Sequence, residues 1–187
     1  MGQRRTEVLH AAIELLDEVG LDGLTMRVLA SRLGVRAGAL YRHYPSKQAL
    51  LDAMVEHLAS PEVAVRVTGP WDERLRIVAT GIREVMLSHR DGARLMSTFR
   101  DPGAEAVQTF LGLIAALVEA GIPEETAVVA VDTVLAYVNG FTTEEQARGG
   151  ERRDRVFREG FDLIIGGIRA RTLGGYSAPH DCDDVPS

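Results

Sequence analysis

The stretch from residue 24 to residue 50 concentrates the side chains of this sequence that could recognise nucleic acid. It contains the basic or imidazole-bearing residues Arg27, Arg32, Arg36, Arg42, His43 and Lys47. Guanidinium groups donate to guanine edges and to phosphate oxygens, so the chemistry indicated here is recognition of DNA. The acidic residues Glu7, Glu14, Asp17, Glu18 and Asp22 all precede the stretch. This order predicts a polarised field, although the whole chain carries a net charge of −6.

Two short helices joined by a tight turn would hold these side chains in place. Thr25 can cap the first helix through its hydroxyl, and Gly34 can take the left-handed conformation that ends it. Leu40 would anchor a second helix from beneath, and Pro45 would stop that helix. The more exposed positions of the second helix are Arg36, Ala37, Gly38, Ala39, Tyr41, Arg42 and His43. Such a helix suits a major groove and predicts a helix-turn-helix, whereas the alternative is an ordinary αα-hairpin.

A further helix is expected before this pair, over residues 3–19. Its apolar residues Val8, Ala12, Leu15 and Val19 recur at helical spacing, and Gly20 supplies a stop. Three helices of this kind can bury one small core between them. The helix-turn-helix would then rest on a fixed support.

The strings GLTMRVLASRLGV and ALYRHYPSKQALLDAM make the first 58 residues resemble the DNA-binding domain of the TetR family of bacterial repressors. The resemblance implies an all-α fold with a three-helix DNA-binding domain over residues 1–58. It also implies a larger helical core over residues 59–173, which binds an effector and dimerises. The string MLSHRDGARL extends the similarity into this core, which is most like that of the tetracycline-repressor members to about Gln146. Residues 174–187 are expected to form a disordered tail.

The same resemblance implies roles for single residues of the DNA-binding domain. Arg27 matches a base-contacting arginine, Thr25 a backbone contact, and Lys47 a phosphate contact at the start of the fourth helix. Tyr41 and His43 match groove or phosphate contacts. The small residues Ala37, Gly38 and Ala39 stand where tetracycline-repressor members have larger polar ones. Base readout is therefore expected from Arg27, Arg36, Tyr41 or Arg42. The alternative for Lys47 is a solvated residue at a helix start.

The core departs from the tetracycline-repressor members where those proteins hold drug and magnesium. Met96 matches the magnesium-ligating histidine, and Phe99 matches a drug-contacting threonine. The further matches to drug-contacting positions are Val63, Val78, Ile82, Leu113 and Glu144, of which only Glu144 keeps an acidic side chain. These residues predict an apolar pocket with one acidic corner that takes a small hydrophobic ligand without a metal or other cofactor. The alternative is a solid core without a ligand.

Composition narrows the class of protein. The chain has 187 residues, of which 45% are hydrophobic and 5% aromatic, and this favours helices over sheets. There is neither an apolar run of about 20 residues nor a cleavable leader pattern, so a cytoplasmic protein is expected. The single Cys182 suggests no disulfide. No phosphate loop, nucleophile elbow or metal-ligand spacing favours an enzyme. His89 and Asp91 are interpreted as residues that stabilise a turn and not as a catalytic pair.

The two long helices expected over residues 123–147 and 151–171 have wide apolar faces. They predict a homodimer built on a four-helix bundle, with two heads matched to a palindromic operator. The alternative is that these helices close a monomeric core. The sequence thus predicts a ligand-responsive, DNA-binding transcriptional regulator, most simply a repressor. The rival from another class is a helical small-molecule binding or interaction module without DNA function.

Overall fold

The computed structural model describes residues 2–58, 68–98, 100, 103–149 and 152–173, and every regular element within these ranges is a helix. The all-α prediction is therefore confirmed. In chain order the helices are α1 (Gly2–Gly23), α2 (Met26–Arg32), α3 (Ala37–Leu40), α4 (Lys47–Leu58), α5 (Trp71–Ser88), α6 (Gly92–Met96), α7 (Ala104–Glu119), α8 (Glu124–Ala147) and α9 (Asp154–Leu173). None of these described helices is both long and apolar enough to cross a membrane.

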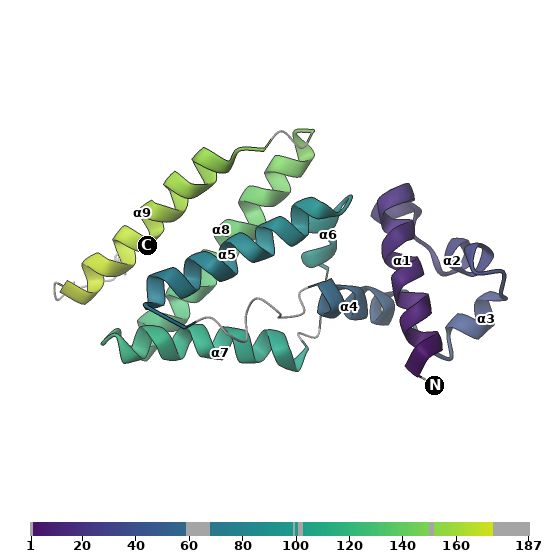
Figure 1. Ribbon diagram of the computed structural model, residues 1–187, viewed down its shortest axis with the longest axis horizontal. Coiled ribbons are helices and arrows are strands. Elements are labelled where there is room, and N and C mark those ends of the chain that lie inside the picture. Colours follow the sequence, from purple (N-terminus) through teal and green to yellow (C-terminus); the bar gives the residue numbers. More distant parts are fainter. Residues whose placement is uncertain (1, 59–67, 99, 101–102, 150–151, 174–187) are drawn as a thin grey trace, which may run out of the picture.

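The molecule has a small N-terminal head and a larger helical core. Figure 1 shows α1, α2 and α3 grouped at one end, with α4 leading from them toward the core. In the core, α5 packs against α8, α8 packs against α7, and α9 lies against α8. The short helix α6 contacts α4, α5 and α8, so it sits where head and core meet.

The head closes around its own apolar centre. The fully buried side chains there include Ala12, Leu16, Leu24, Leu29, Leu40 and Met54, contributed by α1, the segment that follows it, α2, α3 and α4. Removing this much apolar surface from water stabilises the bundle and fixes α3 from beneath. Leu40 is the residue of α3 that enters this core, as the sequence predicts.

The turn between α2 and α3 follows the pattern of a helix that ends on a left-handed glycine. Gly34 has φ 65°, its N–H donates to Ser31 O at 3.2 Å, and the Val35 N–H donates to Ala30 O at 3.0 Å. These two bonds satisfy carbonyls that the end of α2 would otherwise leave open. At the other end of α2, the Thr25 hydroxyl accepts from the Val28 N–H at 3.2 Å. Both sequence predictions for this motif are confirmed.

Three elements differ from expectation. The backbone of Gly20 (φ 73°, ψ 175°) is not helical, as the expected stop requires, but a second short helical segment follows it and extends α1 to Gly23. The second helix of the motif, called the recognition segment below (residues 36–43), is regular helix only over Ala37–Leu40, and residues 41–43 follow as turns. Helix α6 was not predicted, because only a turn was expected near Asp91. It begins after Asp91, whose own backbone is left-handed at φ 56°.

Candidate nucleic-acid interface and effector core

The recognition segment presents its polar side chains to solvent. Arg36, Gly38, Tyr41 and Arg42 are exposed, and Ala37, Ala39 and His43 are partly exposed. Thr25 and Arg27, at the start of α2, are exposed as well, and α2 contacts α3. No carboxylate occurs between Thr25 and Tyr44. This arrangement leaves hydrogen-bond donors free for base edges and phosphate oxygens.

The arginines of the head divide into paired and unpaired groups. Arg32, which the sequence places among the positive charges of the motif, is bound to Glu18 at 2.6 Å and to Glu14 at 3.3 Å. Its contribution to the positive field is therefore largely cancelled, and its role is to hold α2 on α1. Within the described residues, no carboxylate pairs with Arg27, Arg36 or Arg42.

The segment after α3 ties the recognition segment to α1. Ser46 Oγ accepts from the Ala49 N–H at 3.0 Å and caps α4. Lys47 Nζ donates to Leu21 O at 3.3 Å near the end of α1, and its side chain is partly exposed. Tyr44 is buried and donates to Arg5 O at 3.2 Å near the start of α1. These two side chains hold α1 at widely separated points and thereby fix the orientation of α3.

Polar contacts between α1 and the α5–α6 turn (residues 89–91) join the head to the core. Asp91 Oδ2 accepts from the Leu21 N–H at 2.8 Å, and Asp17 Oδ1 accepts from the Arg90 N–H at 2.9 Å. Arg90 Nη1 also donates to Glu18 O at 2.7 Å. A side chain at Gly20 would collide with Asp91, so the kink in α1 leaves room for this turn.

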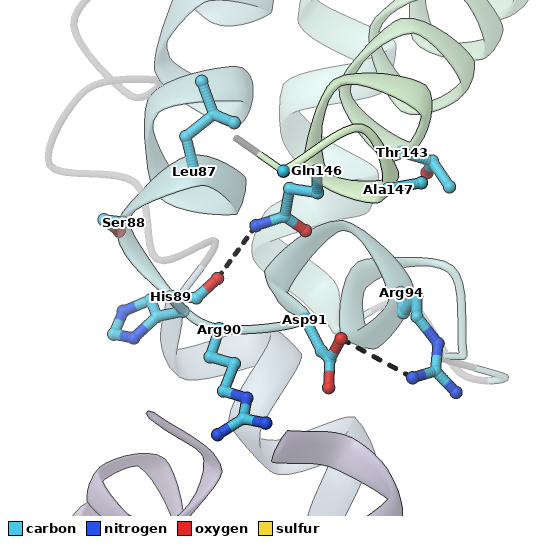
Figure 2. Close-up of a pocket in the computed structure, with 10 residues that line it drawn as sticks. Leu87, Ser88, His89, Arg90, Asp91, Arg94, Thr143, Gln146 and Ala147 are labelled. Carbon is cyan, nitrogen blue, oxygen red and sulfur yellow. Dashed lines mark hydrogen bonds and ion pairs between the residues drawn. The ribbon is translucent and has the colours of Figure 1, made fainter. Parts of the chain in front are cut away.

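The α5–α6 turn is also bound to the core. Gln146 of α8 donates to Met86 O and His89 O, both at 2.9 Å, and accepts from the Ala93 N–H at 2.9 Å. Figure 2 shows Gln146 reaching the turn beside a cleft of about 380 Å³. This cleft is lined by residues of the turn and of the end of α8, and by none of the expected effector-pocket residues. The turn therefore connects the end of α8 to the DNA-binding head.

The residues expected to line an apolar effector pocket fall partly in the core. Val78, Met96 and Leu113 are buried in one apolar cluster with contributions from α5, α6 and α7, and Ile82 packs against it. Val63 and Phe99 lie outside the described residues. Glu144, the expected acidic corner, lies on an exposed side of α8 and not among these buried residues. Its side chain is half exposed and bound to Arg148 at 2.5 Å.

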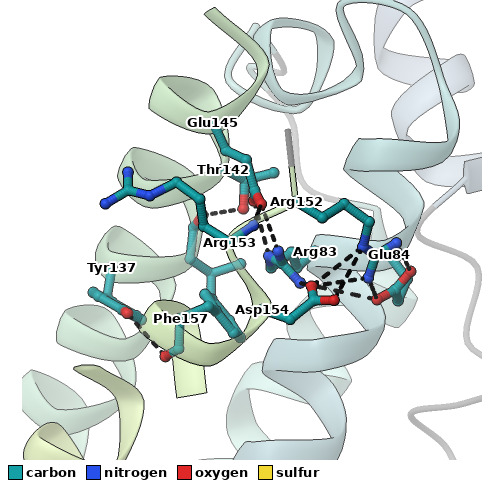
Figure 3. A network of polar contacts seen from close by, with 10 residues as sticks. Arg83, Glu84, Tyr137, Thr142, Glu145, Arg152, Arg153, Asp154 and Phe157 are labelled. Atoms are coloured by element: carbon teal, nitrogen blue, oxygen red, sulfur yellow. Dashed lines mark hydrogen bonds and ion pairs between the residues drawn. The ribbon is translucent and has the colours of Figure 1, made fainter. Parts of the chain in front are cut away.

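The buried carboxylate at this end of α8 belongs to the next residue, Glu145. Its side chain is fully buried and accepts two hydrogen bonds from Arg83 of α5, as Figure 3 shows. Arg83 also binds Asp154 of α9 at 2.8 Å and lies over the Phe157 ring at 4.7 Å. Burial by itself would lower the pKa of Arg83, but the hydrogen bonds that Arg83 donates to Glu145 and Asp154 outweigh it and raise that pKa. One guanidinium thus joins α5, α8 and α9.

Sequence reasoning missed Arg83, Glu145 and the contacts of the α5–α6 turn. Arg83 stands on the apolar stripe of α5 with Leu75 and Val78, and Glu145 follows the buried residues of α8. The available signal was one charged residue on the apolar face of each helix, an arginine on α5 and a glutamate on α8. Among the described residues, no group of three or more histidine, cysteine or acidic side chains could hold a metal ion.

Comparison with known proteins assigns the family. Residues 8–54 match the family model described as bacterial regulatory proteins, tetR family, and residues 66–154 match that of the tetracyclin repressor-like C-terminal domain. The class A tetracycline repressor protein from transposon 1721 of Escherichia coli is 40% identical, over 89% of this chain and 90% of that protein. The chain belongs to the TetR family. It is therefore a helix-turn-helix transcriptional regulator.

Solved structures of TetR-family proteins have the same fold. A possible TetR family transcriptional regulator from Streptomyces coelicolor A3(2) superposes with a TM-score of 0.83 at 34% identity, over 89% of this chain and 99% of that one. BioQ, crystallised with its natural double-stranded DNA operator, superposes with a TM-score of 0.74 at 34% identity. That comparison covers 89% of this chain and 98% of BioQ.

Proposed function

We propose that this protein acts in the cytoplasm as a homodimeric repressor that binds a palindromic operator and is released by a small apolar ligand. The observation that carries the DNA-binding part is the α2–α3 unit, fixed from beneath by Leu40 and presenting Arg27, Arg36 and Arg42 without acidic partners. The BioQ complex supports this reading, because that relative was crystallised with operator DNA. A binding module that had lost DNA function would have no use for this exposed set of guanidinium groups.

The contact residues are proposed to divide by chemistry. Arg27, Arg36 and Arg42 would donate to base edges, with Tyr41 beside them, while Thr25, His43 and Lys47 would contact the backbone. Ala37, Gly38 and Ala39 have no side-chain donors, so they would allow close approach and contact thymine methyl groups or sugars. Their small size is expected to give an operator different from those of the tetracycline repressors.

The exposed apolar side chains of the late helices support a dimer. Val129 on α8 is 59% exposed, and Leu163 on α9 is 79% exposed. Gly166 and Gly167 of α9 have open space around them, which would let a second helix approach closely. A symmetric pairing of α8 and α9 with those of a second copy would cover this surface and place two heads on one side.

The effector proposed for the core is apolar and needs no metal. Val78, Met96, Leu113 and Ile82 offer hydrocarbon and thioether groups, which do not ligate a hard cation such as Mg²⁺. A magnesium–tetracycline complex is therefore not the expected ligand, although a relative is named for tetracycline. A ligand could release DNA only by favouring a dimer whose heads are wrongly spaced. Two routes lead from the core to the head: α4, and the α5–α6 turn bound to α1.

Selection of bound fragments from a pool of random DNA duplexes tests this function. The full chain is expected to enrich one inverted repeat whose half-sites lie about one helical turn apart. Enrichment of single half-sites would contradict the dimer, and no enrichment at low salt would contradict DNA binding. A thermal-shift screen of lipophilic compounds tests the effector. Compounds that raise the unfolding midpoint should also release the enriched duplex, and a set without any response would contradict the ligand proposal.

A further inference from the structure

Arg5 is an exposed arginine of the head that lies outside the helix-turn-helix. Its neighbour Arg4 is bound to Glu7 at 3.2 Å, and Arg32 is bound to Glu14 and Glu18. Arg5 itself has no carboxylate partner among the described residues, a property that it shares with Arg27, Arg36 and Arg42. The acidic residues of α1 thus neutralise some arginines of the head and leave Arg5 with its charge uncompensated.

The Arg5 side chain is held beside the end of the recognition segment. Its guanidinium carbon lies 5.1 Å from the centre of the Tyr44 ring, and the Tyr44 hydroxyl donates to the Arg5 carbonyl at 3.2 Å. Tyr44 is buried and directly follows Arg42 and His43, which are expected to contact DNA. Figure 1 shows the N-terminal end of α1 on the part of the molecule that carries α3. The charge on Arg5 is therefore placed next to the expected DNA-contacting residues.

The stacked geometry suits an anion. A guanidinium that lies over an aromatic ring uses one of its faces and keeps its N–H groups directed outward in the plane. That planar fork matches two oxygens of a phosphate, and a side chain already held in place loses less entropy on binding. We propose that Arg5, positioned by Tyr44, binds a backbone phosphate of the operator, outside the groove that α3 enters. This inference rests on the proposed DNA-binding function.

The test is the salt dependence of binding to the enriched duplex, measured by fluorescence anisotropy. The slope of log K against log salt is negative, and each lost phosphate contact lowers its magnitude by about 0.9, so Arg5→Gln should lower that magnitude by about two units in a dimer. Affinity at low salt should fall roughly tenfold, and by the same factor for mismatched duplexes, because a phosphate carries no sequence information. Arg5→Lys should keep the wild-type slope, since a lysine retains the charge.

Two further variants separate contact from structure. Arg74→Gln removes the same charge from α5, where the side chain donates to Gly69 O in an exposed position, and should leave slope and affinity unchanged. Tyr44→Phe keeps the ring and the charge but removes the hydrogen bond to the Arg5 carbonyl, so it should weaken binding without changing the slope. A wild-type slope in a folded Arg5→Gln variant would overturn the Arg5 contact alone. A wild-type chain that enriches no duplex would instead overturn the proposed function.

Discussion

Arg83 and Glu145 form a two-point ion pair inside the core, with Nη2 to Oε1 at 2.7 Å and Nε to Oε2 at 3.1 Å. Arg83 is 2% exposed and Glu145 is completely buried. Because Arg83 lies on α5 and Glu145 on α8, the pair fixes two helices of the effector core relative to each other. Asp154, the third partner, adds α9 to this arrangement.

Removing one member of this pair should strongly destabilise the fold. Glu145→Ala leaves Arg83 charged in an apolar environment, and the free energy of unfolding should fall by about 3–5 kcal/mol. Urea unfolding followed by circular dichroism measures the change. The double variant Arg83→Met, Glu145→Leu should recover most of it, since a well-packed apolar pair often replaces a buried ion pair. A loss below about 1 kcal/mol in the single variant would contradict this role.

The exposed ion pairs of the same cluster, between Arg152 and the carboxylates of Glu84 and Asp154, should make the free energy of unfolding depend on pH. Hydrogen bonds from Arg152 hold the pKa of Glu84 below its ordinary value of 4.5, and those from Arg83 and Arg152 hold the pKa of Asp154 below 3.8. The unfolded chain therefore binds more protons in this range, so the stabilisation is present above these ordinary values and is lost as pH falls below them, through the lower pKa values of the folded protein.

The matched variant for this pH dependence is Arg152→Gln. Its unfolding midpoint should lie below that of the wild type at about pH 6, and the gap should close as the pH falls toward about 3. Differential scanning calorimetry across this range gives the comparison. A gap that stays constant would show that the ion pairs of Arg152 with Glu84 and Asp154 do not contribute.

The junction between head and core should open when Asp91 is removed. Asp91→Ala leaves the Leu21 N–H without its acceptor, at an expected cost of about 1–3 kcal/mol. Hydrogen exchange at the Leu21 amide should accelerate roughly tenfold or more. Ser88→Ala is the control, because it removes only a local bond to Val85 O in an exposed position. Equal exchange rates in the two variants would show that this junction does not hold α1.

Base preference should depend on Arg27. Arg27→Ala should cost about 1–3 kcal/mol on the enriched duplex and relax the preference at one base pair of each half-site. Binding to duplexes with single substitutions reveals that position. Arg74→Ala, which removes an arginine of α5 bound to Gly69 O, should bind as the wild type does. A uniform loss over all duplexes would instead make Arg27 a backbone contact.

The head was largely predictable because its signals are local. The Thr25 cap, the left-handed Gly34 and the Leu40 anchor each act within a few residues of the chain, and the structure confirms all three. The extent of α3 was not predictable, because its last turn is fixed by the burial of Tyr44 against α1. The charge on Arg32 was misjudged for the same reason, since Glu14 and Glu18 reach it across two helices.

The core was less predictable because its polar contacts join distant parts of the chain. The bonds of Gln146 to the α5–α6 turn and the pair of Arg83 with Glu145 each span two helices. Helix α6 is too short to show a hydrophobic period. It begins after Asp91, whose left-handed backbone could not be predicted from its residue type. Glu144 and Glu145 are neighbours on α8, and one is exposed while the other is buried, because successive helix positions face different directions.

The central claim is that a dimer presents two α3 helices to successive major grooves of one duplex. The most direct measurement is the affinity for the enriched inverted repeat after insertion of about five base pairs, or half a helical turn, between its half-sites. The account predicts a loss of at least about a hundredfold, because one head would then face the wrong side of the duplex. An unchanged affinity would contradict it, since the two heads would then bind independently of their spacing.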